Sequence, residues 1–158
     1  SRRYSRDEMN QMLKYEDCGL KNIWLANGFR YEDLDGVGRC LEIDDIDGLH
    51  RAIGHRLVNY KERLTGPEIR FLRVEMGMSQ KRLADSLGVD EQSVSLWERT
   101  KRRPAIAAER MLRLLYLERM DGTTKVAELI AQWNDTDRQE DELRRVFEDT
   151  EHGWRLAA

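Results

Sequence analysis

Side chains suited to binding nucleic acid are concentrated in the middle of the chain. Residues 61–104 carry 10 basic and 7 acidic side chains, whereas residues 1–60 carry 9 and 11 and residues 121–158 carry 5 and 10. Lysine and arginine pair with phosphates, and glutamine or arginine can bond a base edge through two hydrogen bonds. Because the whole chain has a formal charge of −3, the basic character is local, which favours a defined phosphate-binding surface over a general polycation.

The residues that invite a metal or catalytic interpretation fit it poorly. Cys18 and Cys40 form no CxxC pair, and His50 and His55 are five apart on a predicted helix, where they face different ways. The acidic residues Asp33, Asp35, Asp44, Asp45 and Asp47 lie at a predicted turn and a predicted helix start, where carboxylates are favoured. The sequence also lacks a Ser/His/Asp arrangement, a phosphate-binding glycine loop and a dinucleotide fingerprint. We therefore expect no metal, no cofactor and no enzymatic activity.

Three short helices are predicted between Leu64 and Pro104 from their capping residues. Thr65-Gly66-Pro67-Glu68 fits a capping box with an early proline, and Gly77 ends that first helix. Ser79 caps a second helix that Gly88 closes. Asp90 caps a third helix, in which Val94 and Trp97 point inward. A helix, a tight glycine turn and a second helix form the arrangement that places a recognition helix in the DNA major groove.

The segment from Met78 to Val89, MSQKRLADSLGV, followed by SVSLWER from Ser93 to Arg99, resembles the Xre/Cro family of helix-turn-helix regulators. The resemblance covers about forty residues and includes Pro104 after a basic loop. It implies that Gln80 contacts the DNA backbone and braces the recognition helix.

The outward positions of the third helix are Glu91, Gln92, Ser95, Leu96 and Arg99, because Val94 and Trp97 point the other way. Gln92 suits adenine, Glu91 suits cytosine, Leu96 suits a thymine methyl group, and Arg99 suits guanine or phosphate. Which residue makes which contact stays open. The predicted DNA-binding residues are Gln80, Lys81, Arg82, Asp90, Glu91, Gln92, Ser93, Ser95, Leu96, Arg99, Lys101, Arg102 and Arg103, of which the lysines and Arg82, Arg102 and Arg103 are the expected phosphate contacts.

Residues 11–43 alternate between apolar and polar side chains in short stretches broken by glycine, which predicts β-strands. Asn27-Gly28 is typical of a two-residue hairpin turn between Ile23–Leu25 and Phe29–Tyr31. A second break falls at residues 35–38. The pattern predicts a small antiparallel meander, which needs a partner to bury one face.

Ile46, Leu49, Ile53 and Leu57 recur at helical spacing and predict the helix that covers this sheet. Residues 1–8 are predicted to be an unanchored polar lead. Beyond residue 123, Val126, Leu129, Ile130 and Trp133 predict a short helix. Leu143, Val146 and Phe147 fit a helix, but residues 145–156 also fit a hairpin, which we favour and which could extend the N-terminal sheet.

The predicted fold is therefore α+β in three parts. Residues 9–62 form a small N-terminal β-meander with a covering helix, residues 63–120 form an all-α helix-turn-helix domain, and residues 121–158 form a short C-terminal extension. The absence of a long apolar run and of a signal-peptide core predicts a cytoplasmic, nucleoid-associated protein without a membrane partner. Two cysteines suit a reducing compartment.

The resemblance implies a transcriptional regulator, most often a repressor or autoregulator, that binds an inverted-repeat operator as a homodimer. A dimer seam is one interpretation of the apolar residues Met111, Leu112, Leu114, Leu115 and Leu117, and burial within the chain is the other. An alternative is an antitoxin that binds a protein toxin through residues 9–60. The order of modules is similar to MqsA-type antitoxins, although their cysteine pairs are missing here, and to phage-derived autoregulators.

Overall fold

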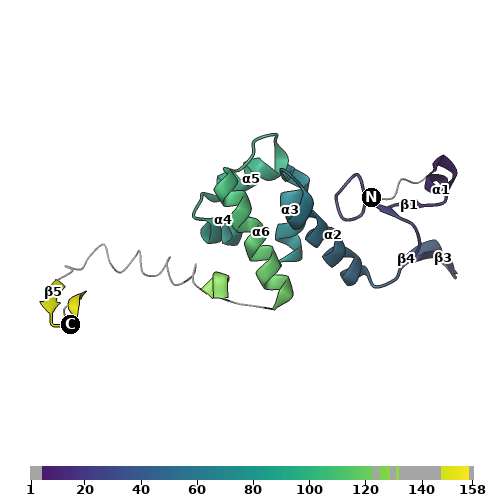
Figure 1. Ribbon diagram of the computed structural model, residues 1–158. Helices are drawn as coiled ribbons and strands as arrows, with labels where there is room; N and C mark the ends of the chain where they lie inside the picture. The colour runs from purple at the N-terminus through teal and green to yellow at the C-terminus, as the bar shows by residue number, and fades with distance from the viewer. Residues whose placement is uncertain (1–4, 123–124, 129–130, 132–146, 157–158) are drawn as a thin grey trace.

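The computed structural model describes residues 5–122, 125–128, 131 and 147–156, which form small antiparallel hairpins and a helical body (Figure 1). This confirms the predicted α+β class. In chain order the elements are α1 (Arg6–Asn10), β1 (Leu13–Lys14), β2 (Trp24–Leu25), β3 (Phe29–Leu34), β4 (Gly38–Ile43), α2 (Ile46–Tyr60), α3 (Gly66–Glu75), α4 (Gln80–Leu87), α5 (Glu91–Arg99), α6 (Ile106–Asp121), β5 (Phe147–Thr150) and β6 (Gly153–Leu156).

The N-terminal strands form two separate two-stranded sheets, so the predicted continuous meander is wrong in its connections. β1 pairs with β2 and β3 pairs with β4, both antiparallel. Asn27-Gly28 is therefore not a hairpin turn, although Gly28 has the positive φ of 77° that such a turn would need. The backbone carbonyl of Gly28 instead accepts from Asp44 N–H at 2.8 Å, which continues the β3–β4 ladder. β2 instead pairs with β1, which is ten residues away in sequence, and Leu25 of β2 is buried. Tertiary packing therefore outweighs the local preference for a turn.

The second predicted break is a hairpin turn, because Gly36 and Gly38, with φ of 84° and 89°, join β3 to β4. Ser5 and Glu8, within the predicted polar lead, form a capping box that starts α1, and no residue of that helix is buried. The hairpin predicted near the C-terminus is present as β5–β6, but it is a sheet of its own and does not extend the N-terminal strands.

The helix predicted to cover the sheet is α2, and most of its buried face packs on other helices. Its buried residues are Ile53, Gly54, Leu57 and Val58, and α2 contacts α3 and α6. At its C-terminal end, Arg113 of α6 donates to the carbonyl oxygens of Leu57, Val58 and Glu62 at 3.1 to 3.4 Å. These bonds attach the C-terminal end of α2 and the residues after it to α6.

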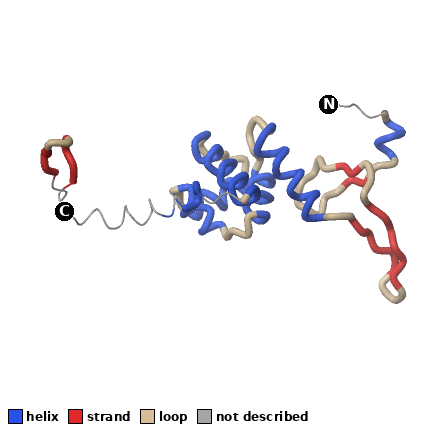
Figure 2. Tube along the Cα trace, turned by 60° about the horizontal axis from the view of Figure 1, so that its bottom comes forward, coloured by secondary structure: helices blue, strands red, loops and turns tan. Residues whose placement is uncertain are grey.

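The described apolar residues form one hydrophobic cluster. Its centre is made of side chains from α3 to α6, and the N-terminal segment adds to it; the most completely buried side chains are Leu64, Ile69, Leu72, Met76, Leu83, Val94, Leu112 and Tyr116. Tyr15, Leu20 and Leu25 from the N-terminal segment belong to the same cluster. Figure 2 shows the helices gathered in the middle and the β3–β4 hairpin extending away from them. The predicted boundaries at residues 62 and 120 stay predictions.

The prediction for the end of the chain is tested only in part. Val126 is described and packs against the core, and the carboxylate of Glu118 accepts from the backbone N–H groups of Val126 and Ala127 at 2.8 and 3.2 Å. Leu129, Ile130 and Trp133 lie outside the described residues.

Candidate nucleic-acid interface

α4 and α5 are bounded by the residues that the sequence predicts. The Ser79 hydroxyl accepts from Arg82 N–H at 3.0 Å and starts α4. Gly88 ends α4 with φ 68°, in the left-handed conformation that glycine adopts without a steric penalty. Asp90 is the N-cap of α5, but its side chain makes no capping hydrogen bond. The carboxylate of Asp90 is therefore not used by the helix and is exposed to solvent.

α5 has one buried side and one outward side. Val94 and Trp97 are buried in the core, as predicted. Of the predicted outward residues, Glu91, Gln92 and Arg99 are exposed, whereas Ser95 and Leu96 are half-buried, as is Ser93. The outward side of α5 therefore presents an amide, a carboxylate and a guanidinium group, the three chemistries that read base edges in the major groove.

A buried ion pair holds α5 in place. Arg73 of α3 donates to both carboxylate oxygens of Glu98, Nε to Oε2 at 2.7 Å and Nη2 to Oε1 at 2.8 Å. The Glu98 side chain is only 4% exposed and that of Arg73 13% exposed. Hydrogen bonding to Glu98 raises the pKa of Arg73 above its usual value. Fork-to-fork pairs of this kind fix geometry as well as charge.

Gln80 adds to the contacts that the Arg73–Glu98 pair makes with α5. Its side-chain Nε2 lies 3.4 Å from Oε1 of Glu98, so the first residue of α4 contacts α5 directly. Arg73 also donates from Nη1 to the carbonyl oxygen of Met78 at 2.8 Å, just before α4 begins. The Arg73–Glu98 pair is not predicted from the sequence, because the two residues are 25 apart and only the folded chain brings them together.

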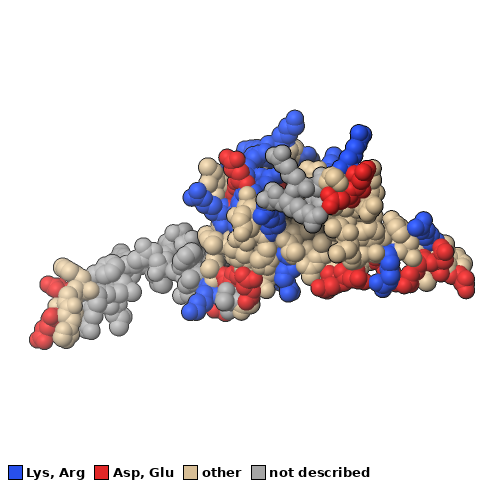
Figure 3. Space-filling model, turned by 45° about the vertical axis from the view of Figure 1, so that its right-hand side comes forward, with Lys and Arg blue, Asp and Glu red and all other residues tan. Residues whose placement is uncertain are grey.

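The expected phosphate-binding residues surround this unit. Lys81, Arg82, Lys101, Arg102 and Arg103 are all exposed. Among the described residues, Lys81 pairs with Asp85 at 3.2 Å, and no acidic partner is found for the other four. Figure 3 shows lysine and arginine projecting from the top of the helical body beside a few acidic side chains, while the lower right edge is mainly acidic.

The basic loop from Lys101 to Arg103 is anchored at both ends. At its start, the Thr100 hydroxyl accepts from Arg102 N–H at 3.1 Å. At its end, Pro104 is buried and its carbonyl oxygen accepts from Arg63 Nη2 at 2.7 Å. The loop therefore presents its three cations from a fixed backbone.

A shallow hollow of about 270 Å³ lies between α3, α4 and α5. It is lined by Arg70, Arg73, Gln80, Ser95, Glu98 and Arg99. Arg70 is exposed and adds a cation that our sequence-based candidates omit. Arg70 could have been found from the helical pattern of α3, because its neighbours Ile69 and Phe71 are apolar and buried.

The comparison with protein-family models decides the nature of this unit. Residues 69–108 match the model described as Helix-turn-helix. The chain carries an Xre/Cro-type helix-turn-helix domain. The match spans most of α3, α4, α5 and the start of α6, and it supports a DNA-binding transcription regulator. Comparisons with curated proteins and with solved structures found no match.

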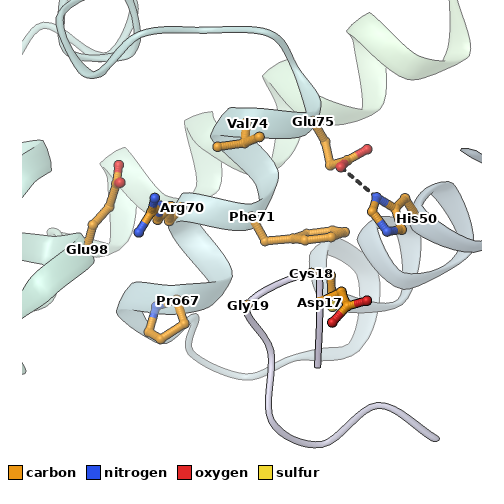
Figure 4. Close-up of a pocket in the computed structure, with 10 residues that line it drawn as sticks. All are labelled: Asp17, Cys18, Gly19, His50, Pro67, Arg70, Phe71, Val74, Glu75 and Glu98. Atoms are coloured by element: carbon orange, nitrogen blue, oxygen red, sulfur yellow. Dashed lines mark hydrogen bonds and ion pairs between the residues drawn. The ribbon is translucent and has the colours of Figure 1, made fainter. Parts of the chain in front are cut away.

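The helix-turn-helix domain contacts the N-terminal segment beside a pocket of about 450 Å³ (Figure 4). His50 of α2 lies between two partners, Glu75 Oε1 at 2.8 Å from Nδ1 and the Tyr15 hydroxyl at 2.7 Å from Nε2. Burial, with the nearby acidic groups, raises the pKa of Tyr15, so its hydroxyl stays protonated. This chain of hydrogen bonds connects residue 15, α2 and the helix-turn-helix domain.

The residues considered for a metal are separated by the fold. Cys18 lines the pocket beside His50, whereas Cys40 lies on β4 and His55 contacts Asp121 at 3.0 Å. Within the described ranges, no three histidine, cysteine or acidic side chains are placed to hold a metal ion. None of the helices described has the length and apolar content that a membrane crossing requires.

Proposed function

We propose that the protein is a sequence-specific transcriptional repressor or autoregulator that binds an inverted-repeat operator as a homodimer. The observation that carries the proposal is the fixed position of α5, whose outward residues Gln92 and Arg99 are exposed while Arg73 and Glu98 hold its inner side. A rigid helix with polar side chains on one face is the element that a helix-turn-helix regulator places in the major groove. It would act in the cytoplasm, at the nucleoid.

In this proposal the side chains of α5 select the sequence. Gln92 bonds adenine, Glu91 accepts from cytosine, and Arg99 reaches guanine or a phosphate. The half-buried Leu96 offers an apolar contact for a thymine methyl group, and Ser93 and Ser95 add hydroxyl groups beside it. Asp90, uncommitted to the helix cap, completes the exposed N-terminal end of α5.

Phosphate contacts set the register of the domain on DNA. Lys101, Arg102 and Arg103 supply them from one side of α5, and Lys81 and Arg82 supply them from α4. Gln80 both contacts Glu98 and lies at the N-terminal end of α4, where backbone N–H groups favour an anion. These contacts account for affinity and salt dependence rather than for sequence choice.

The homodimer requires an exposed apolar surface, and α6 has one. Leu112 and Leu115 of the predicted seam are buried inside the chain, so they cannot serve a partner. Met111 and Leu117 pack against the core, whereas Leu114 is 51% exposed and Ile106, at the start of α6, is also exposed. A two-fold contact through this surface would pair two recognition helices, which must be roughly 34 Å apart to read successive major grooves.

The test is selection of bound sequences from a random duplex library at near-physiological salt. We expect an inverted repeat whose half-sites are centred about ten base pairs apart. A single half-site would contradict the homodimer, and failure to enrich any sequence would contradict sequence-specific binding. Reporter expression from a promoter containing the selected site then distinguishes repression from activation.

A second candidate function is that of an antitoxin that binds a protein through its N-terminal region and also regulates its own operon. The observation that favours it is the exposed β3–β4 hairpin, which carries apolar side chains that the described chain does not cover. The departure from MqsA-type antitoxins stays, because the chain lacks their cysteine pairs.

A further inference from the structure

The β3–β4 hairpin exposes a row of apolar side chains. The register pairs Phe29 with Ile43 and Tyr31 with Leu41, and side chains two apart on a strand share a face. Phe29 and Ile43 pack against the core, whereas Tyr31 is 47% exposed and Leu41 is also exposed. The row therefore leaves the core and continues into solvent, and Val37 at the hairpin tip is 75% exposed.

Arg39 packs against the outer part of this row. The guanidinium of Arg39 lies over the ring of Tyr31, at 4.1 Å from its centroid. Arg39 is paired with Asp33 across the hairpin on the same face. The face thus presents Leu41 and the Tyr31 ring with the Arg39 guanidinium over it, and Asp33 lies at its outer end.

The opposite face of the hairpin is acidic. Arg30 there lies within 3.2 Å of Glu32 and within 2.6 Å of both Glu42 and Asp44, so its charge is already balanced by several carboxylates. Between Phe29 and Asp47 the chain holds seven carboxylates and two arginines. The hairpin and the start of α2 together therefore carry an excess of negative charge beside the exposed apolar row.

The hairpin also has unpaired backbone. β3 and β4 form a two-stranded sheet, and no other described strand pairs with either outer edge. A strand edge that displays unused N–H and C=O groups accepts an extended segment by strand addition. A hairpin of two strands is marginally stable alone, so an added strand would also stabilise it.

The negative charge around the β3–β4 hairpin indicates which kind of partner it can bind. A second copy would bring the same excess of carboxylates to the apolar row, and DNA would bring phosphates, so both are repelled. We propose that the β3–β4 hairpin is the docking surface for a protein partner that adds an extended segment with alternating apolar and basic side chains to the hairpin edge. This inference deepens the second candidate function and does not depend on operator binding.

The experiment selects a random peptide library displayed on phage against the full chain, and measures the affinity of the enriched synthetic peptide by fluorescence anisotropy. We expect peptides in which lysine or arginine alternates with apolar residues. Replacing Tyr31→Ser together with Leu41→Ser should weaken peptide binding roughly tenfold or more. Trp154→Ser is the matched control, since Trp154 is an exposed aromatic on the separate β5–β6 hairpin, and it should leave the affinity unchanged.

A second variant, Asp33→Asn with Asp35→Asn, keeps the apolar row and removes two exposed charges. It should weaken the peptide affinity and reduce its dependence on salt, and it decides the matter if the serine variant does not fold. Operator binding, measured beside it, should stay at the wild-type level in both variants. Loss of operator binding by every form of the chain would contradict the proposed function alone, because the peptide readout uses no DNA.

Three results would overturn the docking proposal. The first is that no peptide is enriched, and the second is that enriched peptides are acidic or bind the hairpin variants as tightly as the wild type. The third is that sedimentation shows a dimer that Tyr31→Ser with Leu41→Ser converts to a monomer, since the occupant would then be a second copy.

Discussion

Arg73 and Glu98 connect two helices of the helix-turn-helix domain through a pair of hydrogen bonds 2.7 and 2.8 Å long. Arg73 also bonds the Met78 carbonyl oxygen, and Gln80 contacts Glu98, so four residues fix α3, the start of α4 and α5 relative to one another. The direction in which α5 presents Gln92 and Arg99 is therefore fixed by this buried charge pair together with the burial of Val94 and Trp97.

Removal of one member of this pair should destabilise the protein strongly. Arg73→Met leaves the Glu98 carboxylate buried without its partner, which costs about 3 kcal/mol in the free energy of unfolding. Urea denaturation followed by circular dichroism measures it. Lys81→Met, which removes the exposed pair with Asp85, is the control and should cost less than about 0.5 kcal/mol. Equal small losses in both variants would show that the buried pair does not hold the domain together.

The caps of this domain are predictable from sequence because capping is local. Thr65 with Glu68, Ser79 and Gly88 act within four residues of themselves, so their types and spacing suffice. Two other interactions join residues at least 25 apart in the sequence: the Arg73–Glu98 pair and the Tyr15–His50–Glu75 chain of hydrogen bonds. No local sequence pattern predicts them.

The pairing of β2 is also not predicted from the sequence, because it depends on a contact with a distant part of the chain. Asn27-Gly28 has the residues of a tight turn, but the partner of β2 is decided by burial of Leu25 against the core. The positions of Val94 and Trp97 are enough to place Glu91, Gln92 and Arg99 on the exposed side of α5, whereas Ser95 and Leu96, predicted with them, are half-buried. Their contacts with individual bases could not be predicted, because those depend on the DNA.

Gly54→Ala is expected to destabilise the protein, against the trend for helices. In an open helix this change stabilises by about 1 kcal/mol, because alanine has the higher helix propensity. Here a Cβ at Gly54 would clash with the Tyr116 hydroxyl, which is buried with no hydrogen-bond partner among the described residues. The crowding should lower the free energy of unfolding by about 1–3 kcal/mol. A rise in the melting temperature of Gly54→Ala would contradict this packing of α2 on α6.

Stability should fall as pH rises through the titration of His55. Its bonds to the Arg51 carbonyl oxygen and to Asp121 raise the pKa of His55 above the ordinary value of about 6.5. The stabilisation is complete below that ordinary value and is lost as pH rises through the higher pKa of the folded state. Because the side chain is partly exposed, the loss should be no more than about 1 kcal/mol. Urea denaturation across this range should give a flatter profile for His55→Gln, and an unchanged profile would contradict this role.

The basic loop should control affinity without controlling sequence. Replacing Lys101, Arg102 and Arg103 one at a time by alanine should weaken binding to every duplex by a similar factor. Each change should reduce the slope of log affinity against log salt by about 1 if that residue neutralises one phosphate. Arg110→Ala, an exposed cation on α6, is the control and should leave the slope unchanged. A loop variant that weakens only one sequence would assign the loop to base contacts instead.

The most direct test of sequence recognition by α5 compares the affinity for the selected operator with that for a scrambled duplex, at near-physiological salt. We expect Gln92→Ala or Arg99→Ala to reduce the difference in binding free energy between the two duplexes by about 1–3 kcal/mol, while binding to the scrambled duplex changes little. Equal weakening on both duplexes would contradict base recognition by α5. If the wild-type chain showed no preference for the operator, the proposed role as a sequence-specific regulator would be contradicted.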